Sequence, residues 1–269
     1  MKTKLCLFTA CLLMSTVCGF ARSKTIKGNG RVVSKNIPIS AYDAVSIVGN
    51  IEFEYEQSQA APSLELTIDE NLIPYLEIKV EGRQLKIAPK QQGEDDNWET
   101  NVQLNPTVYL VKSNSSALKE VNSAGSGSFT VVSPLKIDRM EINKAGSGSV
   151  VFQKRVTGYK AKMNLAGSGE IHAKELAVDQ LECNLAGSGE VYLKGAVPRA
   201  DFSVASSGEI HAFDCKVDKA DCSVAGSGEI EVYAVDRLDA SVVGSGGISY
   251  RGNPSLSKSV MGSGSVEKK

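Results

Sequence analysis

Hydrophobic and polar residues alternate strictly along most of the second half of the chain. In residues 170–173 (Glu-Ile-His-Ala) and 190–193 (Glu-Val-Tyr-Leu), for example, every second residue is apolar. A period of two is the pattern of a half-buried β-strand. No segment between these runs carries ten residues with a helical period. The pattern therefore predicts an all-β fold.

The tripeptide Gly-Ser-Gly interrupts this alternation at nearly constant intervals of 18 to 21 residues. The copies begin at Gly125, Gly146, Gly167, Gly187, Gly226, Gly244 and Gly262, and an altered copy begins at Ser206. A fixed period near 20 residues is typical of a solenoid. Glycine suits a corner that requires a positive φ, where a Cβ is unfavourable. Because each repeat consists of strand, corner and strand, the sequence predicts a single-stranded, right-handed parallel β-helix with coils of about 20 residues.

Equivalent residues of successive coils in such a helix lie about 4.8 Å apart and form columns. One inward column is predicted to hold Phe129, Val150, Ile171, Val191, Ile210, Ile230, Ile248 and Val266, and another Met163, Cys183, Phe202, Cys222 and Ala240. Between them runs a polar column of Asn122, Asn143, Asn164, Asn184, Ser203, Ser223, Ser241 and Ser259. Amides and hydroxyls stacked in this way can form hydrogen bonds along the column.

The first third of the chain lacks the Gly-Ser-Gly corner, although its strand patterns persist. Residues 76–87 predict a hairpin that turns at Gly82, and residues 69–74 predict either one helical turn or a loop. We expect this region to cover one end of the solenoid, which would otherwise expose core and unpaired strand edge. The predicted organisation is one β-helical domain over residues 22–269. Residues 22–112 form its N-terminal β cap and first irregular coils, and residues 113–269 form the regular coils.

The N-terminus has the pattern of a secretory signal peptide over residues 1–21. A basic start is followed by an apolar run over residues 5–17 and by a small-x-small cleavage site at residues 19–21. Lipidation of Cys18 is an alternative, although Val17 is a poor residue immediately before a lipidated cysteine. No later stretch reaches 18 apolar residues, so we expect no transmembrane segment. The predicted location is the periplasm, the outer-membrane surface or the extracellular space.

The net charge and the cysteine positions limit the possible partners and disulfides. The net charge of −1 argues against a nucleic-acid partner. The mature chain contains Cys183, Cys215 and Cys222 in a compartment that could oxidise them. Cys183 and Cys222 lie two coils apart, about 9.6 Å, whereas a disulfide requires Cα atoms within about 7 Å. We therefore expect buried thiols rather than a bridge between these two.

Four stretches near the N-terminus, together with the late Gly-Ser-Gly-Glu coils, resemble a known family. The four are residues 28–32 (Gly-Asn-Gly-Arg-Val), 42–47 (Tyr-Asp-Ala-Val-Ser-Ile), 49–53 (Gly-Asn-Ile-Glu-Phe) and 69–72 (Asp-Glu-Asn-Leu). In combination they are similar to the putative auto-transporter adhesin, head GIN domain family. The resemblance covers nearly the whole mature chain. It implies a secreted protein of Gram-negative bacteria with an adhesin-like role on a β-helical scaffold, and it supplies no catalytic residues.

Outward columns supply the candidate binding residues. One column stacks Glu182, Asp201, Asp221 and Asp239 as a possible cation ladder, because calcium takes six to eight oxygen ligands. Solvated, splayed carboxylates explain the same column without a ligand. A second column holds His172, Tyr192, His211 and Glu231. Its two imidazoles lie two coils apart and cannot share one zinc ion, so we predict no metal site and no cofactor.

The only tryptophan, Trp98, lies in an acidic, turn-rich segment at residues 91–100. It could stack on a sugar ring or contact a cation, or it could fold back on the scaffold.

Two functional hypotheses follow. The first is a non-catalytic adhesin-like binding or structural protein that presents flat solenoid faces to an extracellular or envelope glycan or protein. The alternative is a pectinase-like, polysaccharide-active enzyme with Glu182, Asp201, Asp221 and Asp239 as its acids. The regularity of the coils favours the first, because catalytic clefts on solenoids need local irregularity. The sequence leaves the ligand, the binding face and the oligomeric state open.

Overall fold

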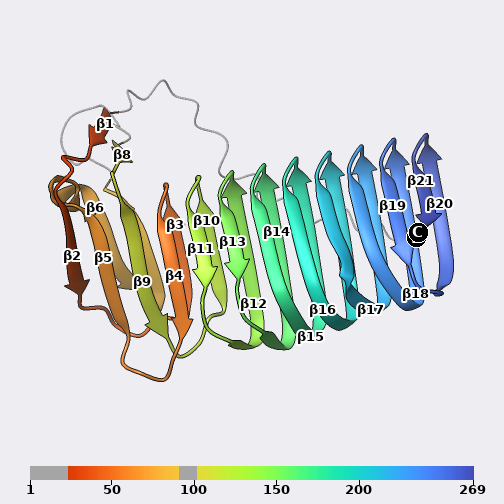
Figure 1. Cartoon of the computed structure of the whole chain (residues 1–269), viewed down its shortest axis with the longest axis horizontal. Coiled ribbons are helices and arrows are strands. Elements are labelled where there is room, and N and C mark those ends of the chain that lie inside the picture. The colour runs from red at the N-terminus through yellow and green to blue at the C-terminus, as the bar shows by residue number, and fades with distance from the viewer. Residues whose placement is uncertain (1–23, 91–101) are drawn as a thin grey trace.

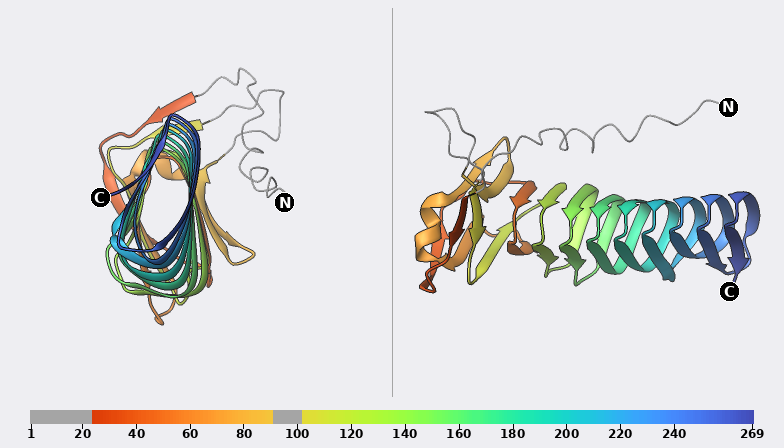
Figure 2. Two further views of the ribbon diagram at one scale, coloured as in Figure 1. Left: turned by 90° about the vertical axis from the view of Figure 1, so that its right-hand side faces the viewer. Right: turned by 90° about the horizontal axis from the view of Figure 1, so that it is seen from above.

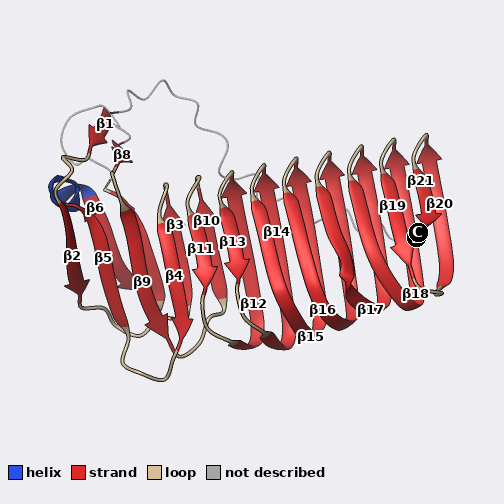
Figure 3. Cartoon of the chain, in the orientation of Figure 1, coloured by secondary structure: helices blue, strands red, loops and turns tan. Residues whose placement is uncertain are grey.

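The computed structural model describes residues 24–90 and 102–269. The described residues are 74% strand and 3% helix, arranged as a β-solenoid of about 7 turns (Figures 1 and 3). The predicted all-β parallel solenoid is therefore confirmed. Viewed along its axis, the coil is a flattened tube whose two broad walls are β-sheets (Figure 2).

The N-terminal elements are β1 (Lys24–Lys27), β2 (Val32–Ile37), β3 (Ala44–Val48), β4 (Glu52–Gln57), β5 (Ser63–Asp69), the 3₁₀ helix η2 (Glu70–Tyr75), β6 (Leu76–Glu81), β7 (Gln84–Pro89), β8 (Val102–Asn105) and β9 (Tyr109–Ser115). The coils that follow contain β10 (Glu120–Ala124), β11 (Ser128–Val131), β12 (Leu135–Gly146), β13 (Ser149–Phe152), β14 (Val156–Gly167), β15 (Glu170–Gly187), β16 (Glu190–Ser206), β17 (Glu209–Gly226), β18 (Glu229–Gly244), β19 (Gly247–Arg251), β20 (Ser255–Gly262) and β21 (Ser265–Lys268).

Strand pairing defines the two walls. The first sheet runs β2–β5–β9–β4–β11–β13, continues through the first halves of β15 to β18, and ends with β19 and β21. The second sheet runs β6–β7–β3–β10–β12–β14, continues through the second halves of β15 to β18, and ends with β20. Each long strand therefore leaves a corner on the first sheet, bends, and returns on the second.

The two glycines of the Gly-Ser-Gly corners are favoured for different reasons. The first glycine has a positive φ, for example 125° at Gly187, and a Cβ there would lie 2.4 Å from the carbonyl oxygen of Gly167. The second glycine is crowded instead, because a Cβ at Gly228 would lie 2.5 Å from the carbonyl oxygen of Gly208. Backbone hydrogen bonds link successive corners, so the corners stack as closely as the strands do. Ser206 keeps the corner geometry at φ 95°.

The predicted columns are present. The residues of the Phe129 column are buried apart from the partly buried Val266, and all five residues of the Met163 column are buried. The asparagine part of the polar column is half-buried and forms a ladder, with amide-to-carbonyl distances of 3.0 Å from Asn143 to Asn122, 2.8 Å from Asn164 to Asn143 and 3.0 Å from Asn184 to Asn164. Each coil thus registers on the next through core packing and through side-chain hydrogen bonds.

The N-terminal third adds antiparallel strands to both sheets. β6 and β7 form the predicted hairpin around Gly82, and the segment after Asp69 is a 3₁₀ helix (Figure 3). The buried Asp69 carboxylate accepts hydrogen bonds from the amides of Gly30 at 2.7 Å and Thr107 at 2.6 Å, which ties two loops together. Protection of the solenoid end by this region stays a prediction.

The cysteines are as expected. Cys183, Cys215 and Cys222 are buried free thiols, and burial raises the pKa of Cys183 and Cys215 to about 12. Because thiols protonated to this degree are poor nucleophiles and poor ligands, they act here as core side chains.

Candidate functional site

The candidate site is a column of rings on the outer face of the first sheet. In the strand register His172 of β15 pairs with Tyr192 of β16, Tyr192 with His211 of β17, and His211 with Glu231 of β18. The residue three positions after the corner points outward in every one of these coils, because the residue before it, such as Ile171 or Val191, points into the core. The predicted column is therefore present as a spatial feature. We call His172, Tyr192 and His211 the ring ladder.

The three rings stack face to face. The ring centroids of His172 and Tyr192 lie 4.7 Å apart with their planes 5° from parallel, and those of Tyr192 and His211 lie 4.7 Å apart at 18°. This spacing equals the distance between neighbouring strands, so the backbone itself sets the stacking distance. The middle ring has both faces covered. The edges of the rings are what the ladder presents to solvent.

A row of glutamates holds the rings in place. Nε2 of His172 lies 2.7 Å from Glu170, the Tyr192 hydroxyl donates to Glu190, and Nε2 of His211 lies 3.3 Å from Glu209. Each of these glutamates lies two residues before its ring and points to the same side of the sheet.

At one end of the ladder Glu231 completes the arrangement. Its carboxylate lies 2.9 Å from Nδ1 of His211. The carboxylates remain accessible, since the side chains of Glu170 and Glu209 are 53% and 47% exposed. The site therefore offers a rigid row of hydrogen-bond acceptors beside aromatic edges.

The hydroxyl of Tyr192, the middle ring of the ladder, has a raised pKa. Its hydrogen bond to Glu190, its partial burial and the negative charges of Glu190, Glu170 and Glu209 raise its pKa to about 12. The hydroxyl is therefore protonated at physiological pH and donates to the carboxylate. A tyrosine held neutral in this way does not serve as a base or nucleophile near pH 7.

The acidic column lies on the second sheet. Glu182, Asp201, Asp221 and Asp239 are in register, as predicted. Glu182 contacts Lys160 at 3.1 Å and Asp239 contacts Arg237 at 2.6 Å. Burial, and then the charges of Asp201 and Asp239, raise the pKa of Asp221.

Basic residues beside this column were missed from the sequence. They form a parallel column of Arg139, Lys160, Arg199, Lys219 and Arg237, interrupted only by Gln180. The signal was available, because Gln180, Arg199, Lys219 and Arg237 each lie two positions before a residue of the acidic column. In residues 24–90 and 102–269, no three His, Cys, Asp or Glu side chains form a group that could hold a metal ion. Cation binding by the acidic column stays a prediction, and Trp98 lies outside the described residues.

The comparisons with known proteins decide the family. The model of the putative auto-transporter adhesin, head GIN domain family matches residues 41–254, which is most of the chain. The chain belongs to this family. The resemblance inferred from the sequence is therefore confirmed. No curated protein matches the chain at a significant level.

Solved structures agree with this family membership. A putative lipid binding protein from Parabacteroides distasonis is 54% identical, with a TM-score of 0.88 over 91% of this chain and all of that chain. A putative adhesin from Parabacteroides merdae is 36% identical, with a TM-score of 0.85 over 92% of this chain and all of that chain. A putative adhesin from Bacteroides fragilis, at 20% identity and a TM-score of 0.66, shares the fold. Among the described residues of this family member, no helix is long and apolar enough to cross a membrane.

Proposed function

We propose that the chain is a non-catalytic, secreted or cell-envelope binding protein that presents the first sheet to a glycan or protein partner. The observation that carries this proposal is the ring ladder with its row of glutamates. Membership of an adhesin family supports both the surface location and the binding role. Export by an N-terminal signal peptide in a Gram-negative bacterium belongs to the same proposal.

The geometry suits contact with an extended partner. Side chains fixed by stacking and by carboxylate hydrogen bonds lose little conformational entropy on binding, so weak contacts give useful affinity. The carboxylates of Glu170, Glu190 and Glu209 recur every 4.8 Å or so along the axis. A repeating surface of this kind can engage several units of one partner at once, and linked contacts strengthen one another.

A binding experiment tests this proposal directly. The mature protein, labelled, is applied to immobilised bacterial and host glycans and to whole cells, and Tyr192→Ala is compared with Tyr159→Ala. Tyr159 is the matched control, because it is a 39% exposed tyrosine of β14 on the second sheet. We expect Tyr192→Ala to reduce binding and Tyr159→Ala to leave it unchanged. Equal binding by both variants and the wild type would contradict the assignment of this face.

The same preparation tests the absence of catalysis. Incubation with polygalacturonate and other polysaccharides, with and without calcium, should leave the chain length of the polymers unchanged. Loss of polymer length that disappears in Asp201→Asn would show instead that the acidic column is an active site.

Lipid binding is a second candidate, because an apolar column lies on the outer surface of the second sheet. The residues that immediately precede each corner are Val48, Ala124, Ala145, Ala166, Ala186, Ala205, Ala225, Val243 and Met261, and the strand register aligns them. Met261 is 66% exposed and Val243 49%. The 54% identical relative carries the name of a lipid binding protein. Co-sedimentation with phosphatidylcholine vesicles that is lost in Met261→Asp would favour this candidate.

A further inference from the structure

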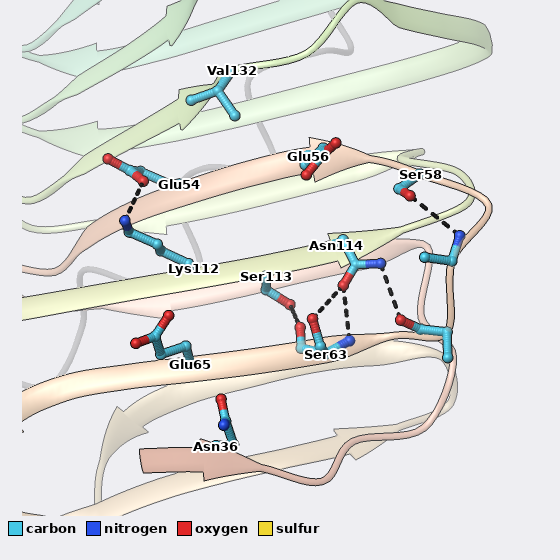
Figure 4. Close-up of a pocket in the computed structure, with 12 residues that line it drawn as sticks. Asn36, Glu54, Glu56, Ser58, Ser63, Glu65, Lys112, Ser113, Asn114 and Val132 are labelled. Atoms are coloured by element: carbon cyan, nitrogen blue, oxygen red, sulfur yellow. Dashed lines mark hydrogen bonds and ion pairs between the residues drawn. The ribbon is translucent and has the colours of Figure 1, made fainter. Parts of the chain in front are cut away.

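A groove of about 400 Å³ lies on the first sheet, in the N-terminal third of the chain, and it is separate from the ring ladder. Its floor is formed by β2, β5, β9 and β4, and its rim by the loop between β4 and β5 (Figure 4). The lining is Asn36, Glu54, Glu56, Ser58, Ala60, Ala61, Ser63, Glu65, Lys112, Ser113, Asn114 and Val132.

Hydrogen bonds within the groove keep its rim in place. Oδ1 of Asn114 accepts from the amide and the hydroxyl of Ser63, at 2.9 and 2.6 Å, and its Nδ2 donates to the carbonyl oxygen of Ala61 at 3.1 Å. The oxygen of this side chain is therefore occupied within the fold, as is one of its two N–H groups. The loop that carries Ala61 is held against β9, and the groove exists without a ligand to shape it.

Other groups in the groove are free to bind. Within the described part of the chain, the side chains of Glu56, Glu65 and Asn36 form no hydrogen bond or ion pair, and Lys112 and Glu54 form one loose contact of 3.5 Å. Carboxylate oxygens accept hydrogen bonds, the Lys112 ammonium donates them, and the Asn36 amide does both. A mixture of strong acceptors and donors on a concave surface matches a ligand that carries several hydroxyl groups.

The charge of the groove restricts this ligand further. Its lining has three carboxylates and a single ammonium group. An anionic ligand such as a uronic acid or a sulfated sugar would face like charges, which is unfavourable when solvent is displaced. Neutral sugars and sugars with a free amine meet no such repulsion. The charge of the lining therefore favours a ligand without acidic groups.

The groove and the ring ladder belong to one row of the sheet. Successive strand partners run from Asn36 through Glu65, Lys112, Glu54, Thr130 and Val151 to His172. The row then continues through the ladder to Glu231. Nine strand spacings separate Asn36 from Glu231, about 43 Å. Both features therefore face the same side and lie on a line parallel to the solenoid axis.

We propose that the groove binds a sugar unit of a glycan that carries no acidic groups, and that the ring ladder contacts the same glycan further along. This inference rests on the proposed function and deepens it, because it adds a second site and names the partner class. In this arrangement Glu65 and Asn36 bind hydroxyl or amine groups of the glycan at the N-terminal end of the row that runs from Asn36 to Glu231.

The test is an array of immobilised neutral, amino-sugar and uronic-acid oligosaccharides of increasing length, probed with the full mature chain. We expect binding to neutral or amine-bearing oligosaccharides, affinity that rises with length, and no binding to uronic-acid oligosaccharides. Glu65→Gln should lower the affinity about tenfold or more, the loss expected for one hydrogen bond to a charged group. Glu175→Gln is the matched control, since that exposed glutamate pairs with Arg155 away from the groove. Circular dichroism confirms that the variants are folded.

Each outcome is decisive. If no neutral or amine-bearing glycan binds, or if uronic-acid oligosaccharides bind as well, the groove proposal is wrong. If binding falls in Tyr192→Ala but not in Glu65→Gln, the ladder function stands and the groove proposal alone fails. If cells or a protein bind through Tyr192 while every glycan is negative, the partner is a protein and the groove proposal is again overturned. Loss of glycan binding in both variants supports both.

Discussion

The corner glycines give the sharpest test of how the sequence specifies the coil. Replacing Gly187 by valine places a β-branched side chain at φ 125°, with its Cβ 2.4 Å from the carbonyl oxygen of Gly167. A sparsely populated backbone conformation costs about 1–3 kcal/mol. Forcing extra atoms into a packed region costs about 1–3 kcal/mol more. The free energy of unfolding should therefore fall by about 2–6 kcal/mol.

Thermal unfolding followed by circular dichroism measures this loss. For a chain of this length about 1 kcal/mol shifts the Tm by roughly 2–4 °C, so Gly187→Val should lower the Tm by roughly 4–24 °C. Ser188→Ala is the matched control, because Ser188 is exposed and the hydrogen bond from its backbone amide to the Gly167 carbonyl oxygen survives the change. It should alter stability by no more than about 0.5 kcal/mol. Equal Tm values for the two variants would refute the claim that positive φ and crowding fix the corner.

Three further changes test the interior and the electrostatics. The ammonium of Lys144 is buried in an apolar column and donates to the Gly125 carbonyl oxygen at 2.7 Å. The equivalent residue in each of the next two coils is a leucine. Lys144→Leu should therefore raise the free energy of unfolding, measured in urea, by about 1 kcal/mol, because a charged group is no longer buried. An unchanged or lower urea midpoint would count against it. Asn164→Ala removes two rungs of the asparagine ladder and should lower the urea midpoint by the equivalent of about 1–3 kcal/mol, whereas no change would show that the ladder is neutral. Burial raises the pKa of Asp43, but hydrogen bonds from Lys119 and Arg83 outweigh it and leave the pKa lowered. The stability from this group is present above the unfolded pKa near 4 and is lost as pH falls through the folded pKa, so Asp43→Asn should flatten the Tm–pH curve at acid pH.

The sequence predicted the regular coils because each coil repeats its neighbour. Once the corner at Gly187 is aligned with the corner at Gly167, the register of every side chain between them follows, and so does the stacking of His172 on Tyr192. Period-two alternation then decides which side chains point inward. Ring stacking and the asparagine ladder are consequences of that register.

The N-terminal third could not be predicted in the same way, because its pairings are long-range and carry no repeat. The sequence does not indicate that β4 lies between β9 and β11, or that Asn36, Glu65 and Lys112 meet on one row. The groove was therefore missed. Lys144 was missed for a different reason. Alignment of the corners places it opposite Leu165, but lysine is a residue that is normally expected on the surface.

The central claim is that the first sheet binds an extended partner through the ring ladder without catalysis. Its most direct test is equilibrium binding of the folded mature protein to the array and to cells, with Tyr192→Ala measured beside Tyr159→Ala. The account predicts that only Tyr192→Ala loses binding and that the bound polymer is recovered at its original length. Retained binding in Tyr192→Ala, or a shortened polymer, would contradict it.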